Sequence, residues 1–215
     1  MIKIIDNFLT KSYHKNILHL LTSVRFEWGY VDDITGAPAN SNGERVFNGY
    51  GFTHPLWVGT DGAISPRSPY FFPMLCQILD VTNCDLIWRA RVDMVTWTGK
   101  EEFIHPPHED FRFPNIATVL YINESDGDTI FYNEKPSMES NPNYKDLKEY
   151  DRVSPKANRL VMFDGDLLHT GCSPTKHKNR ILINSNYIKK EHKEEAEENH
   201  KKMMKTMEKG INENF

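Results

Sequence analysis

The residues best suited to chemistry in this sequence are His108 and Asp110, which have the types and spacing of a metal-binding pair. Residues two apart in an extended strand project from the same face, so both side chains can reach one ion. His169 can supply a third ligand from another strand. Two neutral imidazoles and one carboxylate suit non-haem Fe(II), because they leave coordination positions open for a substrate and O₂. The three residues therefore predict an iron site.

The spacing of His108 and Asp110 is a weak signal by itself, because a chain with 9 histidines and 30 acidic residues contains such pairs by chance. The surrounding sequence strengthens the prediction. His169 follows an apolar run at 160–163 and an Asp-Gly-Asp turn, so it stands where a strand begins after a hairpin. Arg180 follows soon afterwards, at the head of the last strand-like segment.

The elements that must position these residues begin with helices. A short apolar run at 4–9 precedes residues at helical spacing, which predicts a strand and then a helix over about 10–23. A second helix is expected over 73–81. Strands are predicted at 86–97, at 103–111 with a break or kink at Pro106 and Pro107, and at 117–123, 129–132, 159–163 and 180–187. This order predicts a mainly β, α+β fold with a double-stranded β-helix (jelly-roll) core and supporting N-terminal helices.

Strict alternation within two strands predicts which side chains face inward. Along 86–97, one face carries Ala90, Val92 and Met94, and the other carries Arg91, Asp93, Val95 and Trp97. In the last strand, Asn184 and Asn186 share a face with Arg180. Both asparagines are expected to point into the barrel, where they can bind cosubstrate or substrate, or satisfy each other.

Other stretches lack a strand or helix period. Residues 27–70 predict a long loop, and its part from 31 to 70 is expected to contact or gate a substrate. Residues 136–155 predict a polar surface loop. Residues 189–209 contain seven lysines and six glutamates, which predicts a charged helix. We expect one domain over 1–188, with its jelly-roll core at about 86–188, and a charged C-terminal helix within 189–215.

Composition narrows the class of protein. The chain has 215 residues, 39% of them hydrophobic, as is typical of a folded domain. Its net charge is −4 and its lysines gather near the C-terminus, so no nucleic-acid surface is expected over the core. Three cysteines without a CxxC pair argue against a disulfide framework and a cysteine zinc site. The N-terminus lacks a signal-peptide pattern, so a cytoplasmic location without a membrane partner is expected.

The set His108-x-Asp110, His169 and Arg180 resembles that of the iron(II)- and 2-oxoglutarate-dependent oxygenases, particularly the prolyl-4-hydroxylase-like branch. The resemblance covers roughly residues 86–188. Within it, Tyr-Ile-Asn at 121–123 is similar to the family's Tyr-Leu-Asn strand. The sequence Gly-Asp-Thr-Ile-Phe that begins at Gly127 resembles the Gly-Gly-x-Thr-x-Phe segment that follows in the family, with an aspartate in place of the second glycine.

The resemblance implies a role for each matching residue. His108, Asp110 and His169 would bind Fe(II). Arg180 would pair with the distal carboxylate of 2-oxoglutarate, since its fork of donors matches a carboxylate. Three further cosubstrate contacts are expected, from Tyr121, from Asn184 and from Trp97, which stands where the family often has a tyrosine. The implied cofactors are Fe(II) and 2-oxoglutarate, with O₂ as cosubstrate and ascorbate as an optional reductant.

The implied activity is that of a dioxygenase. It would hydroxylate a C–H bond of a peptidyl prolyl or other amino-acid-like substrate, and release succinate and CO₂. The substrate would be a peptide or a small molecule. Two alternatives remain: a non-catalytic jelly-roll protein that binds a metal or ligand, and a cupin-like metal enzyme of another class. Arg180 favours the dioxygenase, because neither alternative needs an arginine inside the barrel soon after the last ligand.

Overall fold

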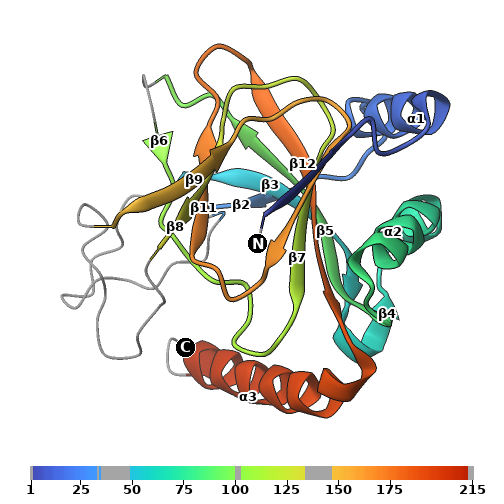
Figure 1. The fold of residues 1–215 in the computed structure, drawn as a ribbon, viewed down its shortest axis with the longest axis vertical. Helices are drawn as coiled ribbons and strands as arrows, with labels where there is room; N and C mark the ends of the chain where they lie inside the picture. The colour runs from blue at the N-terminus through green and yellow to red at the C-terminus, as the bar shows by residue number, and fades with distance from the viewer. Residues whose placement is uncertain (1, 33, 35–48, 100–102, 134–146, 213–215) are drawn as a thin grey trace.

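The computed structural model describes residues 2–32, 34, 49–99, 103–133 and 147–212, and for residues 60, 203, 204 and 206–212 the backbone only. The elements shown in Figure 1, in chain order, are β1 (Lys3–Asp6), α1 (Lys11–Leu21), β2 (Gly29–Val31), β3 (Gly51–Val58), the short 3₁₀ helix η1 (Gly59–Asp61), β4 (Gly62–Ala63), α2 (Ser68–Thr82), β5 (Leu86–Thr96), β6 (Phe103–Ile104), β7 (Ile116–Tyr121), β8 (Thr129–Tyr132), β9 (Glu149–Val153), β10 (Arg159–Asp164), β11 (His169–Ser173), β12 (Asn179–Ile188), the 3₁₀ helix η3 (Lys190–His192) and α3 (Lys193–Asn212).

Two antiparallel sheets form the jelly roll that the sequence predicts. The larger sheet has the order β1-β10-β7-β12-β5-β3-β2, with β4 paired to β3, and the smaller has the order β6-β11-β8-β9. Neighbours in the larger sheet are mostly far apart in sequence, as β10, β7, β12 and β5 show. This pairing brings residues of the N-terminal, middle and C-terminal thirds into one sheet. The predicted fold class is therefore confirmed.

The larger sheet separates two hydrophobic layers. Its outer face packs against α1 and α2, whose buried residues include Ile17, Leu21, Phe71, Met74 and Ile78. Its inner face packs against the smaller sheet. Alternation along β10 shows both sides: Leu160 and Met162 belong to the helix-side core, whereas Val161 and Phe163 belong to the layer between the sheets.

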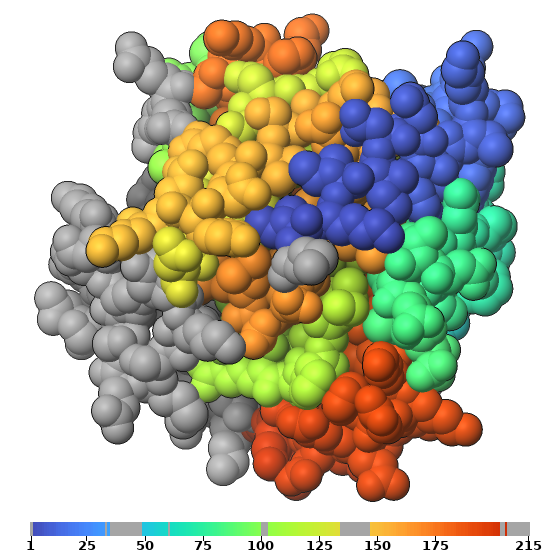
Figure 2. Space-filling model, in the orientation of Figure 1, coloured from blue at the N-terminus to red at the C-terminus, as the bar shows by residue number. Residues whose placement is uncertain are grey.

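The helices cover the outside of this framework. Figure 1 shows α1 and α2 beside the larger sheet, and α3 across one end of the strands. In Figure 2, the N-terminal segment, α2 and α3 follow one another along one side of the surface. Among the described residues, no helix is long and apolar enough to cross a membrane. With α1, α2 and α3 all on the outside, the space between the sheets is left to side chains from strands and loops.

Several predicted boundaries were wrong. The stretch 27–70 contains strands β2 and β3, and the predicted loop 136–155 contains β9. Four of the five residues of β9 are exposed, so this edge strand lacks the apolar alternation by which strands are recognised. In β3, Pro55 and a register shift interrupt the pattern. A gating role for 31–70 rests partly on residues 35–48, which lie outside the described residues.

Two further elements differ from prediction for reasons of proline chemistry. Helix α2 begins at Ser68 instead of Pro73, with Pro69 in its first turn and Pro73 inside it. The predicted strand 103–111 is only Phe103–Ile104, because Pro106 and Pro107 follow and cannot donate ladder hydrogen bonds. The chain then rejoins the smaller sheet by a single bridge at His108.

The turn that leads into β12 is held by one carboxylate. Asp126 accepts hydrogen bonds from the backbone N–H groups of Thr175, Lys176 and His177, at 2.9, 2.8 and 3.1 Å, and from the Thr175 hydroxyl at 2.6 Å. Burial alone would raise the pKa of Asp126, but these bonds outweigh it and hold the pKa well below its usual range. This clamp sets the start of β12, and therefore of Arg180.

We expect Asp126→Ala to lower the free energy of unfolding by about 2 kcal/mol at pH 7, because several donors lose a charged acceptor. An aspartate whose folded pKa is lowered stabilises the fold above its unfolded pKa of about 3.9, and this contribution is lost as pH falls toward the folded value. The difference between the two proteins should therefore shrink below about pH 4. Urea unfolding at several pH values measures this difference in the free energy of unfolding. Asp61→Ala, at an exposed position, is the control. An equal difference at pH 7 and pH 3 would contradict the assignment.

Candidate metal centre and adjoining cavity

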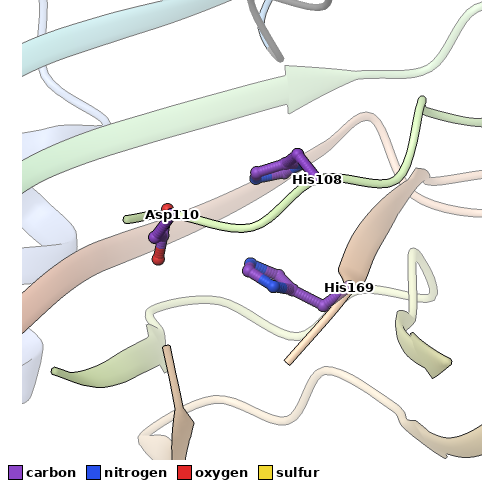
Figure 3. A group of neighbouring side chains, drawn as sticks. All are labelled: His108, Asp110 and His169. Carbon is purple, nitrogen blue, oxygen red and sulfur yellow. The ribbon is translucent and has the colours of Figure 1, made fainter. Parts of the chain in front are cut away.

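The side chains of His108, Asp110 and His169 meet between the two sheets. One ligand atom of each lies within 4.8 Å of the others, and Figure 3 shows the three side chains directed toward a common point. His108 and Asp110 come from the loop after β6, and His169 begins β11. The structure thus brings together the three residues that the sequence singles out as a metal site.

Backbone pairing fixes the separation of the two histidines. The His108 N–H donates to the carbonyl of His169 at 2.9 Å, and the His169 N–H donates to the carbonyl of His108 at 3.0 Å. This reciprocal pair is an isolated antiparallel bridge. The two imidazole ring centres are consequently only 4.7 Å apart. The main chain alone therefore holds two of the three ligand groups side by side.

Hydrogen bonds and burial leave both imidazoles ready to bind a cation. Nδ1 of His169 donates to the Leu167 carbonyl at 2.8 Å, which directs the lone pair to Nε2. Nδ1 of His108 makes a longer contact of 3.4 Å with the Pro106 carbonyl. Burial, followed by the proximity of His169, lowers the pKa of His108 to about 3. The His108 ring is therefore neutral at ordinary pH, as a metal ligand must be.

The Asp110 carboxylate is the most constrained of the three groups. Arg89 donates to its Oδ1, and Nδ2 of Asn186 donates to its Oδ2 at 2.9 Å. Nε of Arg89 also donates to Oδ1 of Asn186 at 3.1 Å, so the three side chains form a closed ring. Burial would raise the pKa of Asp110, but the charge of Arg89, the proximity of the two histidines and the hydrogen bond from Asn186 hold the pKa well below its usual range.

This donor set fits a divalent transition metal. It provides two neutral imidazole nitrogens and one ionised carboxylate, and hydrogen-bonded partners orient each group. Its two-histidine, one-carboxylate composition leaves room in the coordination sphere of an iron ion for further ligands. The chemistry of the residues present thus agrees with the predicted Fe(II), and a cysteine-rich zinc site is excluded by their identity.

A cavity of about 70 Å³ adjoins His108 and His169 and is lined by Ile34, Arg91, Asp93, Val95, His105, His108, Val119, Thr129, His169, Thr170, Gly171, Arg180, Leu182 and Asn184. Arg180 is only 4% exposed. One of its terminal nitrogens donates to the Thr129 hydroxyl at 2.7 Å, whereas its Nε has no partner among the described residues. A buried guanidinium with an unused donor calls for a ligand that accepts hydrogen bonds.

Two glycines make room for the Arg180 side chain. A Cβ at Gly171 would lie 2.9 Å from a terminal nitrogen of Arg180, and one at Gly127 would lie 3.0 Å from its Cδ. The Gly127 Cβ would also meet the carbonyl oxygen of Cys172. Any larger residue at either position would therefore displace the arginine or the strand beneath it.

The three other predicted cosubstrate contacts occupy different positions. Tyr121 is fully buried beneath Arg180, with its ring centre 5.2 Å from the guanidinium carbon, and its hydroxyl bonds to Thr129 at 2.6 Å. Thr129, and not Tyr121, is among the residues that line the cavity. Asn184 does line it, as the alternation predicts. Trp97 is 55% exposed and is not among the described lining residues.

Sequence reasoning missed two residues of this region. Arg89 and Thr129 were not singled out, although the alternation along β5 places Arg89 on the same face as Arg91 and therefore inward. Thr129 stood inside the quoted Gly-Asp-Thr segment. Neither residue has a spacing of its own that marks a role, because each acts through a partner on another strand: Asp110 for Arg89, and Arg180 for Thr129.

Comparison with protein families identifies the region that carries this site. The model of the 2OG-Fe(II) oxygenase superfamily matches residues 94–188, which contain the three candidate ligands and Arg180. This match confirms the family resemblance. The comparison with curated proteins found no match.

Solved structures of oxygenases share the fold at low sequence identity. A prolyl-4-hydroxylase from Pseudomonas putida is 14% identical with a TM-score of 0.55, over 88% of this chain and 92% of its own. A Trichoplax adhaerens prolyl hydroxylase in complex with a hypoxia-inducible-factor peptide is 17% identical with a TM-score of 0.52, over 89% and 85%. HygX from Streptomyces hygroscopicus, with nickel, 2-oxoglutarate and hygromycin B, is 11% identical with a TM-score of 0.53, over 88% and 83%. These similarities establish the common architecture.

Removing one candidate ligand should weaken metal binding severely. We expect Asp110→Ala to reduce Fe(II) affinity by more than about 100-fold. This loss exceeds the one usual for residues that only hydrogen-bond to a metal ligand. His108→Ala and His169→Ala should behave alike, and the exposed His19→Ala should have no effect. Anaerobic calorimetric titration with Fe(II) gives the affinities. Undiminished affinity in Asp110→Ala would remove this carboxylate from the site.

The hydrogen bonds from Arg89 and Asn186 to Asp110 should contribute less to Fe(II) affinity than Asp110 itself. Asn186→Ala leaves the carboxylate in place but removes one of its two donors. We expect a loss of about 10- to 100-fold in Fe(II) affinity, as is typical of groups that orient a ligand. The same titration measures it. A loss as large as that of Asp110→Ala would show instead that Asn186 holds the whole site together.

Proposed function

We propose that the protein is an Fe(II)- and 2-oxoglutarate-dependent dioxygenase that hydroxylates a C–H bond of an amino-acid-like substrate. The observation that carries this proposal is the shared cavity, in which two of the candidate iron ligands and a buried, incompletely paired Arg180 line the same space. A protein that only bound a metal would have no use for such an arginine. A cosubstrate that has a carboxylate at one end and a metal-chelating group at the other would bind both Arg180 and the metal.

His108, Asp110 and His169 would hold the iron. The His108 imidazole is neutral and the Asp110 carboxylate is ionised, so neither of these ligands needs to lose a proton at ordinary pH. The ring formed by Arg89, Asn186 and Asp110 would keep the carboxylate in one orientation, and the backbone bridge would keep the imidazoles in theirs.

Arg180 would take the distal carboxylate of 2-oxoglutarate. Its guanidinium lies at the end of a hydrogen-bonded chain through the hydroxyls of Thr129 and Tyr121, which fixes its position before the anion arrives. The buried surroundings strengthen the ion pair and exclude water from it. Thr129, which lines the cavity, can offer a further hydroxyl contact.

When bound, iron and 2-oxoglutarate would supply the oxidation of the substrate by O₂. In the balanced reaction, R–H, 2-oxoglutarate and O₂ give R–OH, succinate and CO₂. The contribution of the chain is position and a dry pocket, since the cofactor carries the difficult chemistry. Val95, Val119 and Leu182 provide the apolar part of the cavity wall.

The class of substrate is part of this proposal. Two of the structurally similar proteins are prolyl hydroxylases, one of them with a peptide, and a third holds hygromycin B. A peptidyl prolyl residue and a free amino acid are therefore the two substrates to try first. Both present a saturated carbon beside amide or amine and carbonyl groups.

We expect Arg180→Ala to bind Fe(II) normally yet need at least about 30-fold more 2-oxoglutarate, since losing one partner of a buried charge pair costs about 2–5 kcal/mol. Anaerobic titration of the Fe(II) protein with 2-oxoglutarate, followed by its visible charge-transfer band, measures this. Arg180→Lys keeps the positive charge, so its affinity for 2-oxoglutarate should lie between those of the wild type and of Arg180→Ala. Exposure to O₂ then tests turnover through succinate.

The control is Arg25→Gln, which removes an exposed arginine far from the cavity in sequence and should leave the 2-oxoglutarate titration unchanged. Wild-type protein that shows neither the band nor succinate above an iron-free sample, with prolyl peptides and amino acids present, would refute the dioxygenase. Equal 2-oxoglutarate affinity in Arg180→Ala would refute the assigned role of this residue.

A further inference from the structure

A second polar pair in the cavity is not used by the proposed cofactors. Arg91 on β5 and Asn184 on β12 are direct cross-strand partners in the sheet register. Directly opposed residues project to the same face with their Cβ atoms about 5 Å apart. Both line the cavity together with His108 and His169. A substrate that approaches the metal site from this side would meet the two residues as one unit.

Arg91 is held ready and yet incompletely paired. Its Nε donates to Oδ2 of Asp93 at 2.9 Å, and the Thr53 hydroxyl donates to Oδ1 of the same carboxylate at 2.8 Å. Asp93 is 4% exposed and is therefore shielded from water, whereas the Arg91 side chain is 30% exposed. The terminal nitrogens of Arg91 have no hydrogen-bond partner among the described residues. The guanidinium is thus oriented by one edge and has donors left for an anion.

Asn184 presents the opposite polarity. Its side chain belongs to a residue that is only 7% exposed, and its Oδ1 has no hydrogen-bond partner among the described residues. A buried, unsatisfied acceptor costs stability and therefore calls for a partner, which a ligand can provide. The cavity thus offers free donors at Arg91 and, beside them, a free acceptor at Asn184.

The charge of the cavity favours an anionic substrate. The charged residues among its described lining are Arg91, Arg180 and Asp93, which leave one positive charge. Asp110 is balanced by Arg89. Fe(II) and the 2-oxoglutarate dianion would cancel each other. The loaded site would therefore retain one positive charge, in surroundings of low dielectric constant where a complementary carboxylate is strongly preferred.

We propose that Arg91 and Asn184 bind the substrate, Arg91 taking a carboxylate and Asn184 an adjacent N–H. This inference rests on the proposed function and narrows it. The chemistry is that of an amino acid with a free carboxylate, which is present in a free L-amino acid and in the C-terminal residue of a peptide. An internal prolyl residue of a peptide lacks this carboxylate and would leave Arg91 without its anion.

The test uses full-length protein loaded with Zn(II) and 2-oxoglutarate, so that binding is measured without turnover. Saturation-transfer NMR is recorded with each proteinogenic L-amino acid, with the N-acetyl derivative as a stand-in for a peptide C-terminus, and with the methyl ester of each. We expect at least one acid to bind and its ester to bind at least tenfold more weakly. Preference between the free and the N-acetyl acid identifies the source of the carboxylate.

Variants assign the effect to residues. Arg91→Gln should lower the affinity for that acid at least tenfold, and Asn184→Ala should lower it by a smaller factor. Arg91→Gln, Asp93→Asn combined removes both charges of the ion pair and should give the same loss as Arg91→Gln, even where the single variant folds poorly. Arg25→Gln is the matched control. The variants at Arg91, Asp93 and Arg25 should keep the wild-type affinity for 2-oxoglutarate, which also reports on folding.

The outcomes separate this inference from the proposed function. If 2-oxoglutarate binds but no acid does, or esters bind as well as acids, or Arg91→Gln binds the acid like wild type, the assignment of Arg91 is overturned and the dioxygenase stands. If wild-type protein fails to bind 2-oxoglutarate, the proposed function falls and this inference falls with it.

Discussion

The structure depends on a single electrostatic requirement, namely that a carboxylate buried between two β-sheets must be balanced. An isolated ionised carboxylate in such a place would be protonated, and the metal site would lose its anionic ligand. Arg89 balances the charge of Asp110, and Asn186 donates a hydrogen bond to the second oxygen of this carboxylate. These two partners come from β5 and β12, which are hydrogen-bonded neighbours at the centre of the larger sheet. Two central strands of the larger sheet thus provide both partners of the buried carboxylate.

Strand β12 shows how one element serves two layers. Ile181 and Ile183 face the helices and help to form the main core. The alternating residues Arg180, Leu182 and Asn184 line the cavity on the other face. The inward-facing residues from Arg180 to Asn186 are therefore a mixture of polar and apolar side chains. Because register determines which set faces inward, a shift by one residue would bury the isoleucines in the site and expose the polar groups to the helices. The clamp at Asp126 and the paired neighbours oppose such a shift.

Much of this arrangement follows from the sequence, and the failures have a common cause. The jelly roll and the inward faces of β5 and β12 were predictable, because period-two alternation and turn residues act locally. The proximity of His108 to His169 is not a local signal and was predicted from the ligand types and the family resemblance. Strands β2 and β9 were missed because these edge strands lack alternation, and β3 because Pro55 and a register shift interrupt its pattern. Arg89 and Thr129 were missed because their partners lie on other strands. Tyr121 was expected to line the pocket, but the fold places it one layer deeper, beneath Arg180. Local pattern predicts orientation, whereas depth depends on how the sheets pack.

The bridge between His108 and His169 has a consequence for how the protein handles metal. In small zinc domains the ligands converge only when the ion binds, so binding and folding are one event and a chelator unfolds the chain. Here backbone hydrogen bonds join the two histidines, and the helix-side core contains none of the three candidate ligands. The main chain therefore holds the two imidazoles side by side without the help of an ion. We expect a metal ion to bind to, and leave, a protein that is already folded.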